Sequence, residues 1–455
     1  MLLVARYVLP VSSSHIENGA VLVRDGKIAD VGTAAKLKTR YTDEETIDFG
    51  LAAIMPGFID THMHLEYSAL RGLINDVPYA AWKLHISDRE KRFSPQDWED
   101  SALLGALEAV RSGITTIADI TSTGASLKAA KEAGLHGTIY REAGTMDRNE
   151  IDEALDSAFS DVEEWRSTTD PARLRIGIAP TTLFTCHPMI VKRIGEYAAN
   201  GTPVAIHLAG SREEYEFIRY GSSPFSVHST EQERGYGIDM PPWLATGVSP
   251  VNYILNWGLF EAPDVMAIHC VWVNDDDIDK LVEYDIAVGV CSRCNAQLAM
   301  GIPPLLKFIE AGLRIGLGTD SPAANSTTDM VAEMSFGMLL QRALGKRSSF
   351  LTAAEMVYLA TMGGATALRV ENEVGSLEVD KTANIIAIDL SNSNQAPTHD
   401  PHSAIVNTTT QDNILMTMID GRLVYDKRHP DVHLHGIDVH RTLARAEEMR
   451  LKLRN

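Results

Sequence analysis

Two histidines stand one residue apart at the end of an apolar run, in the stretch PGFIDTHMHLE that covers residues 56–66. Side chains alternate between the two faces of an extended strand, so we expect His62 and His64 to point the same way and Met63 the other way. Two imidazoles on one face can bind a single metal ion. An isolated His-x-His pair can also be an ordinary strand end, so other residues must support the metal interpretation.

Three further side chains of the right chemistry fall at the ends of other β-prone runs. His207 ends PVAIHLA, His269 ends VMAIHC and Asp320 ends RIGLGTD. If these runs are strands of a parallel barrel, their carboxyl ends lie at one rim and the five side chains gather there. Three imidazoles and a carboxylate suit a divalent ion such as zinc, with one position open for water. Such an ion lowers the pKa of water from about 15.7 towards 7, so the pattern predicts metal-dependent hydrolysis.

The elements that must position these residues alternate regularly between residues 55 and 369. Longer helical patterns, such as residues 98–111, 189–200 and 276–284, separate eight β-prone runs. The runs are GFIDTHMH, GITTIADI, HGTIYREA, RLRIGIAP, PVAIHLA, VMAIHC, IAVGVC and RIGLGTD. This alternation predicts an α/β fold with a (β/α)8 TIM barrel. An open doubly wound sheet could give a similar count, but its Gly-rich phosphate fingerprint is missing.

Both ends of the chain are β-rich and carry favoured hairpin turns, Asp25-Gly26 and Asp420-Gly421. We expect the two ends to build one small β-sandwich domain around the inserted barrel. The predicted boundaries are 1–54 and 371–430 for the β-sandwich, 55–370 for the barrel and 431–455 for a solvent-facing helical tail.

Composition excludes several classes of protein. The chain has 455 residues, 45% of them hydrophobic, and 41 basic against 61 acidic residues give a formal charge of -20. This charge opposes binding to nucleic acid or to anionic membranes. No run approaches the roughly 18 apolar residues of a membrane span, and the first ten residues lack a basic leader. We expect a small-molecule substrate and a homo-oligomer.

The four cysteines are too few for a disulfide framework in a chain of this length and favour a cytoplasmic location. Cys291 and Cys294 form a lone Cys-x-x-Cys, which we interpret as loop residues. His433 and His435 form a second His-x-His, which we interpret as a surface segment because it lies beyond the predicted barrel.

The segments PGFIDTHMHLE, IHLAGSREE, AIHCVW and GLGTDSPAANSTTDM, in this order, resemble the amidohydrolase superfamily. Within it, the chain is similar to the mononuclear aminohydrolases and chlorohydrolases, a branch that includes cytosine, guanine and adenosylhomocysteine deaminases. The resemblance covers nearly the whole chain. It implies a distorted barrel in which His62, His64, His207 and Asp320 hold one metal ion. It also implies that His269 orients the attacking water and that Asp320 takes its proton.

The resemblance favours one zinc ion per chain, with iron as the less favoured alternative. Superfamily members with two metals usually bridge them with a carboxylated lysine at the end of the fourth strand. The corresponding stretch in this chain, LRIGIAPTTLFT, contains no lysine.

Two positions depart from the pattern of the branch. Deaminases of this kind normally carry a glutamate three residues after the strand-five histidine, where it moves a proton to the ring, and this chain has Gly210. Adenosylhomocysteine-type deaminases typically have a histidine where this chain has Thr181, which weakens a nucleoside assignment. We expect Glu66 or Glu142 to replace the missing glutamate, because Ser211 and Glu214 are better explained as a helix capping box.

Two further residues are predicted to contact substrate. Arg141 matches an arginine that binds substrate in the branch, with a purely structural role at the barrel end as the equal alternative. Trp82 lies where the first loop of the branch often covers the site, with plain packing as the equal alternative. The predicted activity is hydrolytic deamination of an aminated heterocycle of purine, pteridine or nucleoside type. Two alternatives stay open, namely chlorohydrolase-type loss of another leaving group and a binding protein that kept the fold without turnover.

Overall fold

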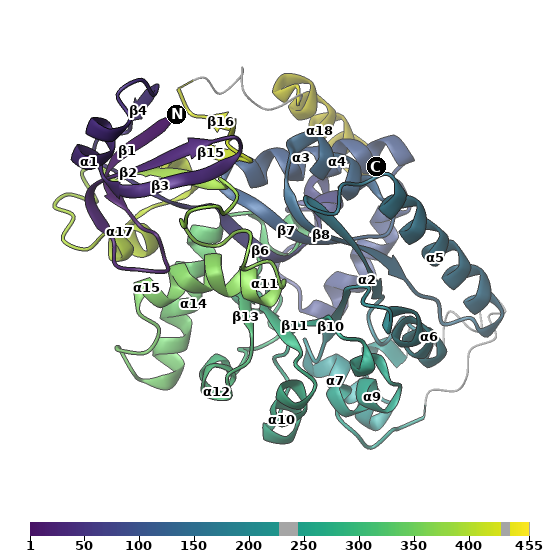
Figure 1. Cartoon of the computed structure of the whole chain (residues 1–455). Coiled ribbons are helices and arrows are strands. Elements are labelled where there is room, and N and C mark those ends of the chain that lie inside the picture. Colours follow the sequence, from purple (N-terminus) through teal and green to yellow (C-terminus); the bar gives the residue numbers. More distant parts are fainter. Residues whose placement is uncertain (227–243, 429–436, 455) are drawn as a thin grey trace.

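The computed structural model describes residues 1–226, 244–428 and 437–454. The second His-x-His pair, His433 and His435, lies outside these residues. Figure 1 shows a barrel with its surrounding helices and, beside it, a second sheet that contains both the first and the last strands of the chain.

Eight parallel strands form the barrel in the order β13-β12-β11-β10-β9-β8-β7-β6. Each overlaps one of the eight predicted runs, so the predicted (β/α)8 barrel is confirmed. The strands are β6 (Phe58–Met63), β7 (Ile114–Thr121), β8 (His136–Ala143), β9 (Leu174–Pro180), β10 (Val204–Leu208), β11 (Val265–His269), β12 (Ala287–Val290) and β13 (Ile315–Leu317).

The first and last strands meet at the end that carries the predicted site. The backbone N–H of Asp320 donates to the carbonyl oxygen of His62 at 2.8 Å, and the Thr61 hydroxyl donates to the Leu317 carbonyl at 2.9 Å. The barrel is therefore nearly closed, and residues 258 positions apart in the chain become neighbours.

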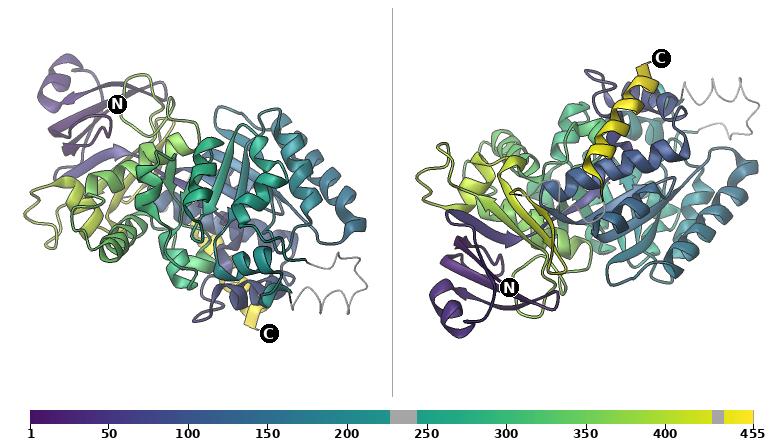
Figure 2. Two further views of the ribbon diagram at one scale, coloured as in Figure 1. Left: turned by 90° about the horizontal axis from the view of Figure 1, so that it is seen from below. Right: turned by 90° about the horizontal axis from the view of Figure 1, so that it is seen from above.

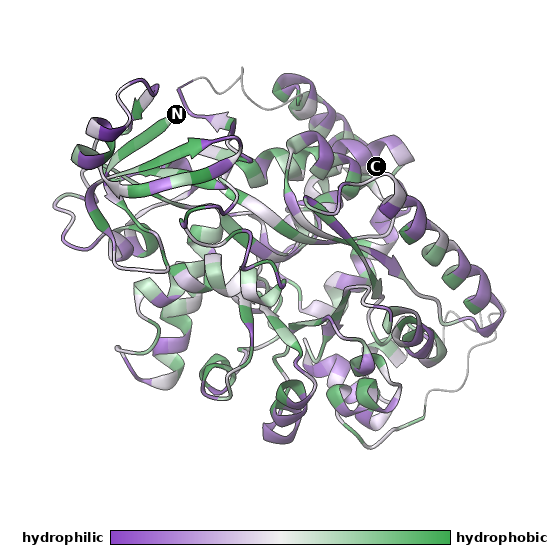
Figure 3. Cartoon of the chain, in the orientation of Figure 1, coloured by the Kyte–Doolittle hydropathy of each residue, from purple (hydrophilic) through white to green (hydrophobic). Residues whose placement is uncertain are grey.

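Helices surround the barrel. Most strands carry buried residues along their whole length, as expected when both faces of a parallel sheet are covered. Figure 3 shows the hydrophilic residues concentrated on the outer faces of helices such as α5 and α10. The α-helices of this region are α2 (Tyr79–Glu90), α3 (Pro95–Arg111), α4 (Ala125–Ala133), α5 (Ile151–Ser167), α6 (Pro188–Ala198), α7 (Arg212–Tyr220), α9 (Pro250–Asn256), α10 (Asp275–Glu283), α11 (Ser292–Gln297), α12 (Leu305–Glu310), α13 (Pro322–Asn325), α14 (Met330–Gly345), α15 (Ala353–Tyr358) and α16 (Gly364–Ala367).

Shorter turns complete the barrel region. Four are 3-10 or π turns between the longer elements. They are η1 (Leu65–Leu70), η2 (Arg148–Glu150), η3 (Leu259–Glu261) and the π-helical η4 (Leu359–Gly363).

The second sheet unites the two ends of the chain, as Figure 2 shows from two sides. Its strand order is β16-β15-β14-β5-β1-β2-β3, with β4 paired to β1. This confirms the predicted small β-domain built from both ends. Its elements are β1 (Leu2–Val8), β2 (Ile16–Arg24), β3 (Lys27–Thr33), α1 (Ala34–Arg40), β4 (Thr46–Asp48), β5 (Ala52–Pro56), β14 (Ile385–Asp389), α17 (Pro401–Thr408), η5 (Gln411–Asn413), β15 (Ile414–Ile419) and β16 (Arg422–Asp426).

Both predicted hairpin turns are present in this sheet. Asp25 and Gly26 connect β2 to β3 with φ of 49° and 77°, and Asp420 and Gly421 connect β15 to β16 with φ of 51° and 71°. Positive φ at both turn residues is the conformation that Asp-Gly pairs favour in two-residue hairpins.

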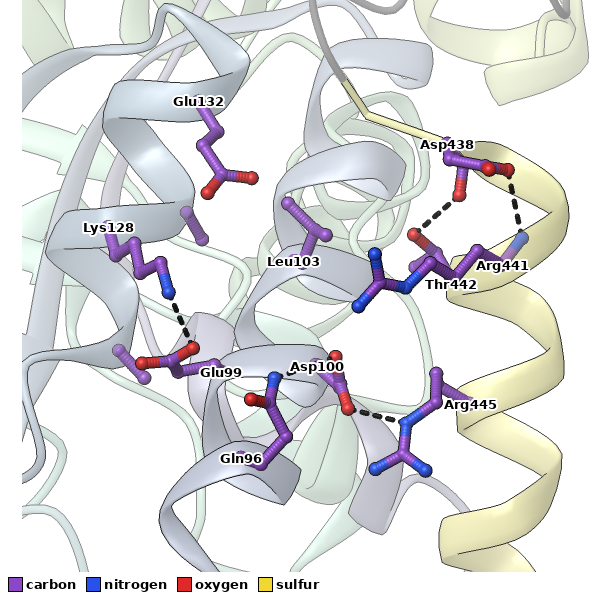
Figure 4. Close-up of a pocket in the computed structure, with 12 residues that line it drawn as sticks. Gln96, Glu99, Asp100, Leu103, Lys128, Glu132, Asp438, Arg441, Thr442 and Arg445 are labelled. Carbon is purple, nitrogen blue, oxygen red and sulfur yellow. Dashed lines mark hydrogen bonds and ion pairs between the residues drawn. The ribbon is translucent and has the colours of Figure 1, made fainter.

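The C-terminal helix α18 (Val439–Arg454) packs against α3 rather than facing solvent throughout. Met449 is fully buried, and Arg445 Nε donates to Asp100 Oδ2 at 2.6 Å, as Figure 4 shows. A cavity of about 310 Å³ lies between α3, α4 and α18, and its lining contains none of the predicted site residues. Among the described helices, none is long and apolar enough to cross a membrane.

Candidate metal centre and active site

The structure brings five predicted residues together at the carboxyl ends of the barrel strands. The candidate ligand atoms of His62, His64 and His207 all lie within 4.8 Å of one another, and so do those of His62, His269 and Asp320. Their positions follow from strand order, because β6, β10, β11 and β13 end at the same rim. His62 belongs to both groups and lies at the centre of the cluster.

The imidazoles are arranged to present lone pairs to one another. His64 Nδ1 lies 2.9 Å from the carbonyl oxygen of Ile120. Because a carbonyl only accepts hydrogen bonds, Nδ1 carries the proton and Nε2 keeps its lone pair. That Nε2 lies 3.4 Å from Nε2 of His207. Nε2 of His62 is buried with no hydrogen-bond partner among the described residues.

Burial favours the neutral form of His62 and His207. Loss of hydration lowers the pKa of His62 well below its ordinary value, and the neighbouring imidazoles lower it further. The pKa of His207 is lowered well below its ordinary value for the same first reason. Neutral imidazoles with unpartnered nitrogens are what a transition metal needs, so this donor set fits a divalent ion of the zinc type.

Asp320, in the turn that follows β13, completes the cluster. Its Oδ1 lies 3.7 Å from His62 Nε2, and its Oδ2 lies 3.9 Å from His269 Nε2. The backbone N–H of Ser321 donates to Oδ1 at 2.5 Å. The thiol of Cys294 donates to Oδ2 at 2.7 Å. Both oxygens of the carboxylate are therefore held in place.

The contact from Cys294 corrects the interpretation of the Cys-x-x-Cys as loop residues. Cys294 lies in α11, Cys291 is the N-cap residue of that helix after β12, and both side chains are buried. A lone Cys-x-x-Cys gives no indication of this, because the rotation of α11 about its axis, which places Cys294 beside Asp320, depends on packing.

Asp60 connects β6 to β13 below the cluster. Its carboxylate accepts hydrogen bonds from the Thr319 backbone N–H at 3.0 Å and the Thr319 hydroxyl at 2.5 Å, and from the His62 backbone N–H at 3.2 Å. Burial raises the pKa of Asp60 to about 7, and the charge of Asp320 adds to the shift. This positioning residue was not predicted from the sequence.

The cluster opens into a small cavity of about 50 Å³. Of the four predicted substrate-contacting residues, Trp82 and Glu142 line it, and Trp82 Nε1 donates to the Ala323 carbonyl at 3.3 Å. The full lining is His64, Tyr67, Tyr79, Trp82, Lys83, Glu142, Thr182, His207, His269, Cys294, Leu298, Met300, Asp320, Ser321 and Ala324.

The other two predicted contacts, Glu66 and Arg141, are not among the described residues that line the cavity. The carboxylate of Glu66 accepts hydrogen bonds from the last residue of β7 and the two that follow it, at 2.7 to 3.0 Å. These residues are Thr121, Ser122 and Thr123. Arg141 Nε donates to Asp161 at 2.7 Å. Both side chains therefore hold strand ends and helices together in this structure.

The loop after β10 explains the carboxylates near Gly210. Ser211 caps α7, since its hydroxyl accepts from the Glu214 N–H at 3.1 Å. The Glu214 carboxylate in turn accepts from the backbone N–H groups of Ala209 and Gly210 at 2.9 and 3.0 Å. Glu214 is thus committed to the backbone of its own loop, and burial raises its pKa to about 7.

Several residues that line the cavity were not singled out as site residues from the sequence, among them Tyr79, Lys83 and Cys294. Tyr79 and Lys83 lie on α2, one turn apart, with Trp82 between them. The tryptophan was the available signal, because its helical neighbours on the same face would enter the same cavity.

Comparisons with known proteins agree with this geometry. The sequence profile of the Amidohydrolase family matches residues 53–424, and that of an imidazolonepropionase-like composite domain of bacteria matches only residues 19–43. The chain is 30% identical over 431 residues to a 5-methylthioadenosine/S-adenosylhomocysteine deaminase of Thermodesulfovibrio yellowstonii, covering 92% of each chain. It is also 30% identical over 447 residues to the enzyme of that name from Pelotomaculum thermopropionicum, covering 96% of this chain and 94% of the other.

Solved structures share the fold. An adenosine deaminase from Xanthomonas campestris with bound zinc has a TM-score of 0.83 at 24% identity, covering 100% of this chain and 98% of that one. Atrazine chlorohydrolase of Arthrobacter aurescens TC1, complexed with zinc, has a TM-score of 0.82 at 19% identity, covering 98% and 99%. Guanine deaminase of E. coli has a TM-score of 0.76 at 20% identity, covering 94% and 99%. The chain therefore belongs to the amidohydrolase family.

Proposed function

We propose that this protein is a metal-dependent hydrolase that removes ammonia from an aminated heterocycle. The observation that carries the proposal is the convergence of four histidines and an aspartate at one rim of the barrel, beside a small cavity. The deaminase names of the relatives support the reaction, and their family supports the metal dependence.

We infer that His62, His64, His207 and Asp320 hold one metal ion per chain, and that the ion is zinc rather than iron. The unpartnered imidazole nitrogens support this assignment. The zinc recorded in two structures of the same fold supports the choice of metal. When bound, such an ion lowers the pKa of a water molecule and makes a nucleophile available at neutral pH.

The chain's own residues would manage the protons. Asp320 faces both His62 and His269 and is oriented by Ser321 and Cys294, so it is placed to take the proton of the attacking water. His269 lies against the opposite oxygen of the same carboxylate and would orient that water and stabilise the adduct.

Ring deamination also needs a proton delivered to a ring nitrogen, and we assign this role to Glu142. Its carboxyl group lines the cavity, whereas that of Glu66 is occupied by four hydrogen bonds. Burial raises the pKa of Glu142, which favours a protonated carboxyl that can donate.

A second candidate reaction is release of another leaving group, as in the chlorohydrolases. Gly210 favours it, because no side chain fills that position and a Cβ built there would lie 2.9 Å from Met300 Cε and 3.1 Å from His269 Cδ2. A reaction that needs no ring protonation would tolerate this absence.

A turnover screen separates the candidates. Metal-loaded protein is incubated with aminated purines, pteridines, pyrimidines and nucleosides, and with chlorinated triazines, and both ammonia and chloride are measured. We expect ammonia from at least one amino-heterocycle and no chloride. Chloride release without ammonia would favour the second candidate, and neither product would support a binding protein.

The proposal also includes a cellular location and an oligomeric state. We place the protein in the cytoplasm, because its four cysteines are unpaired and buried, as is usual in a reducing compartment. We also propose a homo-oligomer, which light scattering coupled to size-exclusion chromatography would test.

A further inference from the structure

Lys83 brings a positive charge to the wall of the active-site cavity. It lies on α2, next to Trp82 and one turn after Tyr79, and all three residues line the cavity. Within the described parts of the chain, its ammonium group makes no hydrogen bond and no ion pair within 4.0 Å. The side chain is only partly exposed.

Glu142 faces the same cavity from β8 and likewise has no hydrogen-bond partner for its carboxylate among the described residues. The two charges influence each other, since Lys83 lowers the pKa of Glu142 against the effect of burial. The Lys83 ammonium nitrogen nevertheless lies more than 4.0 Å from the Glu142 carboxylate oxygens, so the two side chains form no direct ion pair. A donor and an acceptor at such a spacing leave room for a ligand to bind both.

The rest of the wall limits the shape of that ligand. Trp82, Leu298, Met300 and Ala324 provide apolar surface suited to a flat ring. The cavity of about 50 Å³ is much smaller than the roughly 300–1,000 Å³ of typical drug-sized sites. Tyr79, which lines the cavity, packs edge-on against Phe184 and Phe225, whose rings stack at 3.6 Å. A single-ring or two-ring base fits this enclosure better than a ligand with a long substituent.

We propose that Lys83 is a specificity-determining residue that donates a charge-assisted hydrogen bond to an oxygen attached directly to the substrate ring. This inference rests on the proposed function and narrows its substrate to an oxo-substituted amino-heterocycle of nucleobase size. A ring carbonyl adds one acceptor atom, whereas a carboxylate adds three heavy atoms to a cavity with little spare volume. Without such an oxygen, a partly buried ammonium group would stay unpaired beside the bound ring, which is costly.

Inert ring probes test this recognition separately from catalysis. Pyrimidine, pyrimidin-2-one and pyrimidin-4-one lack a leaving amine and differ only in the presence or position of one oxygen. Their dissociation constants are measured by calorimetry with zinc-loaded protein. We expect at least one oxo probe to bind about tenfold or more tightly than pyrimidine, the lower range for a hydrogen bond to a charged donor.

Variants identify the donor. Lys83→Met removes the charge at similar side-chain length and should reduce the preference for the oxo probe over pyrimidine to less than about threefold. Lys83→Arg should retain most of this preference. Lys128→Met is the matched control and should behave as wild type, because Lys128 is exposed on α4, forms an ion pair with Glu99 of α3 and does not line the active-site cavity. Zinc content and circular dichroism confirm that each variant is folded and loaded.

The outcomes are distinct. Equal binding of all three probes to wild-type protein, failure of every probe to bind, or an oxo preference that survives in Lys83→Met would overturn the assignment. Ammonia release in the turnover screen judges the proposed function independently. A working deaminase without an oxo preference therefore refutes only the role of Lys83.

Discussion

Four residues at the rim of the barrel have a backbone conformation that non-glycine residues rarely adopt. Ala209, His269, Cys270 and Asp320 have φ of 50°, 72°, 46° and 59°. Such conformations typically cost about 1–3 kcal/mol each and persist only where the surroundings fix them. Backbone bonds from Cys270 to Leu208 and from Asp320 to His62 provide that constraint. The strain therefore lies where His269 and Asp320 turn towards the cluster.

His269 is expected to serve chemistry rather than to hold the metal. Its Nε2 lies beside Asp320, but the other three histidines already supply the imidazole donors. His269→Asn should leave metal content nearly unchanged and lower turnover by roughly 10²–10⁴-fold, the range for acid–base participation. Elemental analysis and steady-state kinetics on one preparation measure both quantities. Loss of metal in this variant would instead make His269 a ligand.

Glu142 and Glu66 are the two candidates to replace the glutamate that is absent at Gly210, and the same substitution in each distinguishes them. Glu142→Gln should lower turnover about a hundredfold or more with metal retained, because the amide cannot donate its proton to a ring nitrogen in the same way. Glu66→Gln should lower thermal stability more than turnover per folded, metal-loaded chain, because Glu66 accepts four hydrogen bonds at the end of β7. Full activity of Glu142→Gln would remove Glu142 from the mechanism.

At the scale of elements, Glu333 on α14 links that helix to α11. Its carboxylate accepts from the Arg293 N–H at 3.2 and 3.3 Å, and burial raises its pKa from 4.5 to about 8. Between pH 4.5 and about 8, the Glu333 carboxyl group keeps its proton in the folded protein and releases it in the unfolded chain. The contribution of Glu333 to stability is therefore present below about pH 4.5 and is lost as the pH rises through about 8.

Urea unfolding of wild type and Glu333→Gln at pH 5.5 and 7.5 tests this linkage. As the pH rises, the unfolding free energy of wild type should fall relative to that of Glu333→Gln by up to about 1.4 kcal/mol per pH unit. Glu310→Gln, at an exposed position of α12, is the control. Its unfolding free energy should change with pH in parallel with that of wild type. If the unfolding free energies of wild type and Glu333→Gln also change in parallel with pH, Glu333 is not a buried, protonated carboxyl group.

The strands could be predicted from the sequence because each is a short β-branched run with helical patterns on both sides. The five residues of the cluster could be predicted for the same reason, since each stands at or just after a strand end. Cys294 could not, because it reaches the cavity from a helix whose rotation about its own axis depends on packing. For Lys83 the only signal was its helical neighbour Trp82. Asp60 also required the folded barrel, since its partner Thr319 lies 259 residues away.

At the scale of the whole molecule, α18 ties the end of the chain to the barrel. Arg445 bonds to Asp100 and Lys452 to Asp97, whose side chain is 1% exposed. Arg445→Ala should lower the free energy of unfolding by about 1–2 kcal/mol, because it leaves a mostly buried carboxylate without its partner. Arg450 is the control, because it forms an exposed ion pair with Glu447 on the same helix.

Arg450→Ala should cost less than about 0.5 kcal/mol, as is usual for exposed pairs within a helix. Unfolding in urea followed by circular dichroism compares the two variants. Equal, small effects of both substitutions would mean that α18 contributes little to the stability of the barrel.

The metal content of the purified protein tests the central claim most directly. Elemental analysis should find close to one transition metal ion per chain, with zinc predominating, because the four proposed ligands converge and the fourth strand offers no bridging lysine. His62→Ala with His64→Ala should abolish this content, whereas His433→Ala with His435→Ala, which alters the other His-x-His pair, should leave it unchanged. Two metal ions per chain, or full retention of metal in the His62 and His64 variant, would contradict the assigned centre.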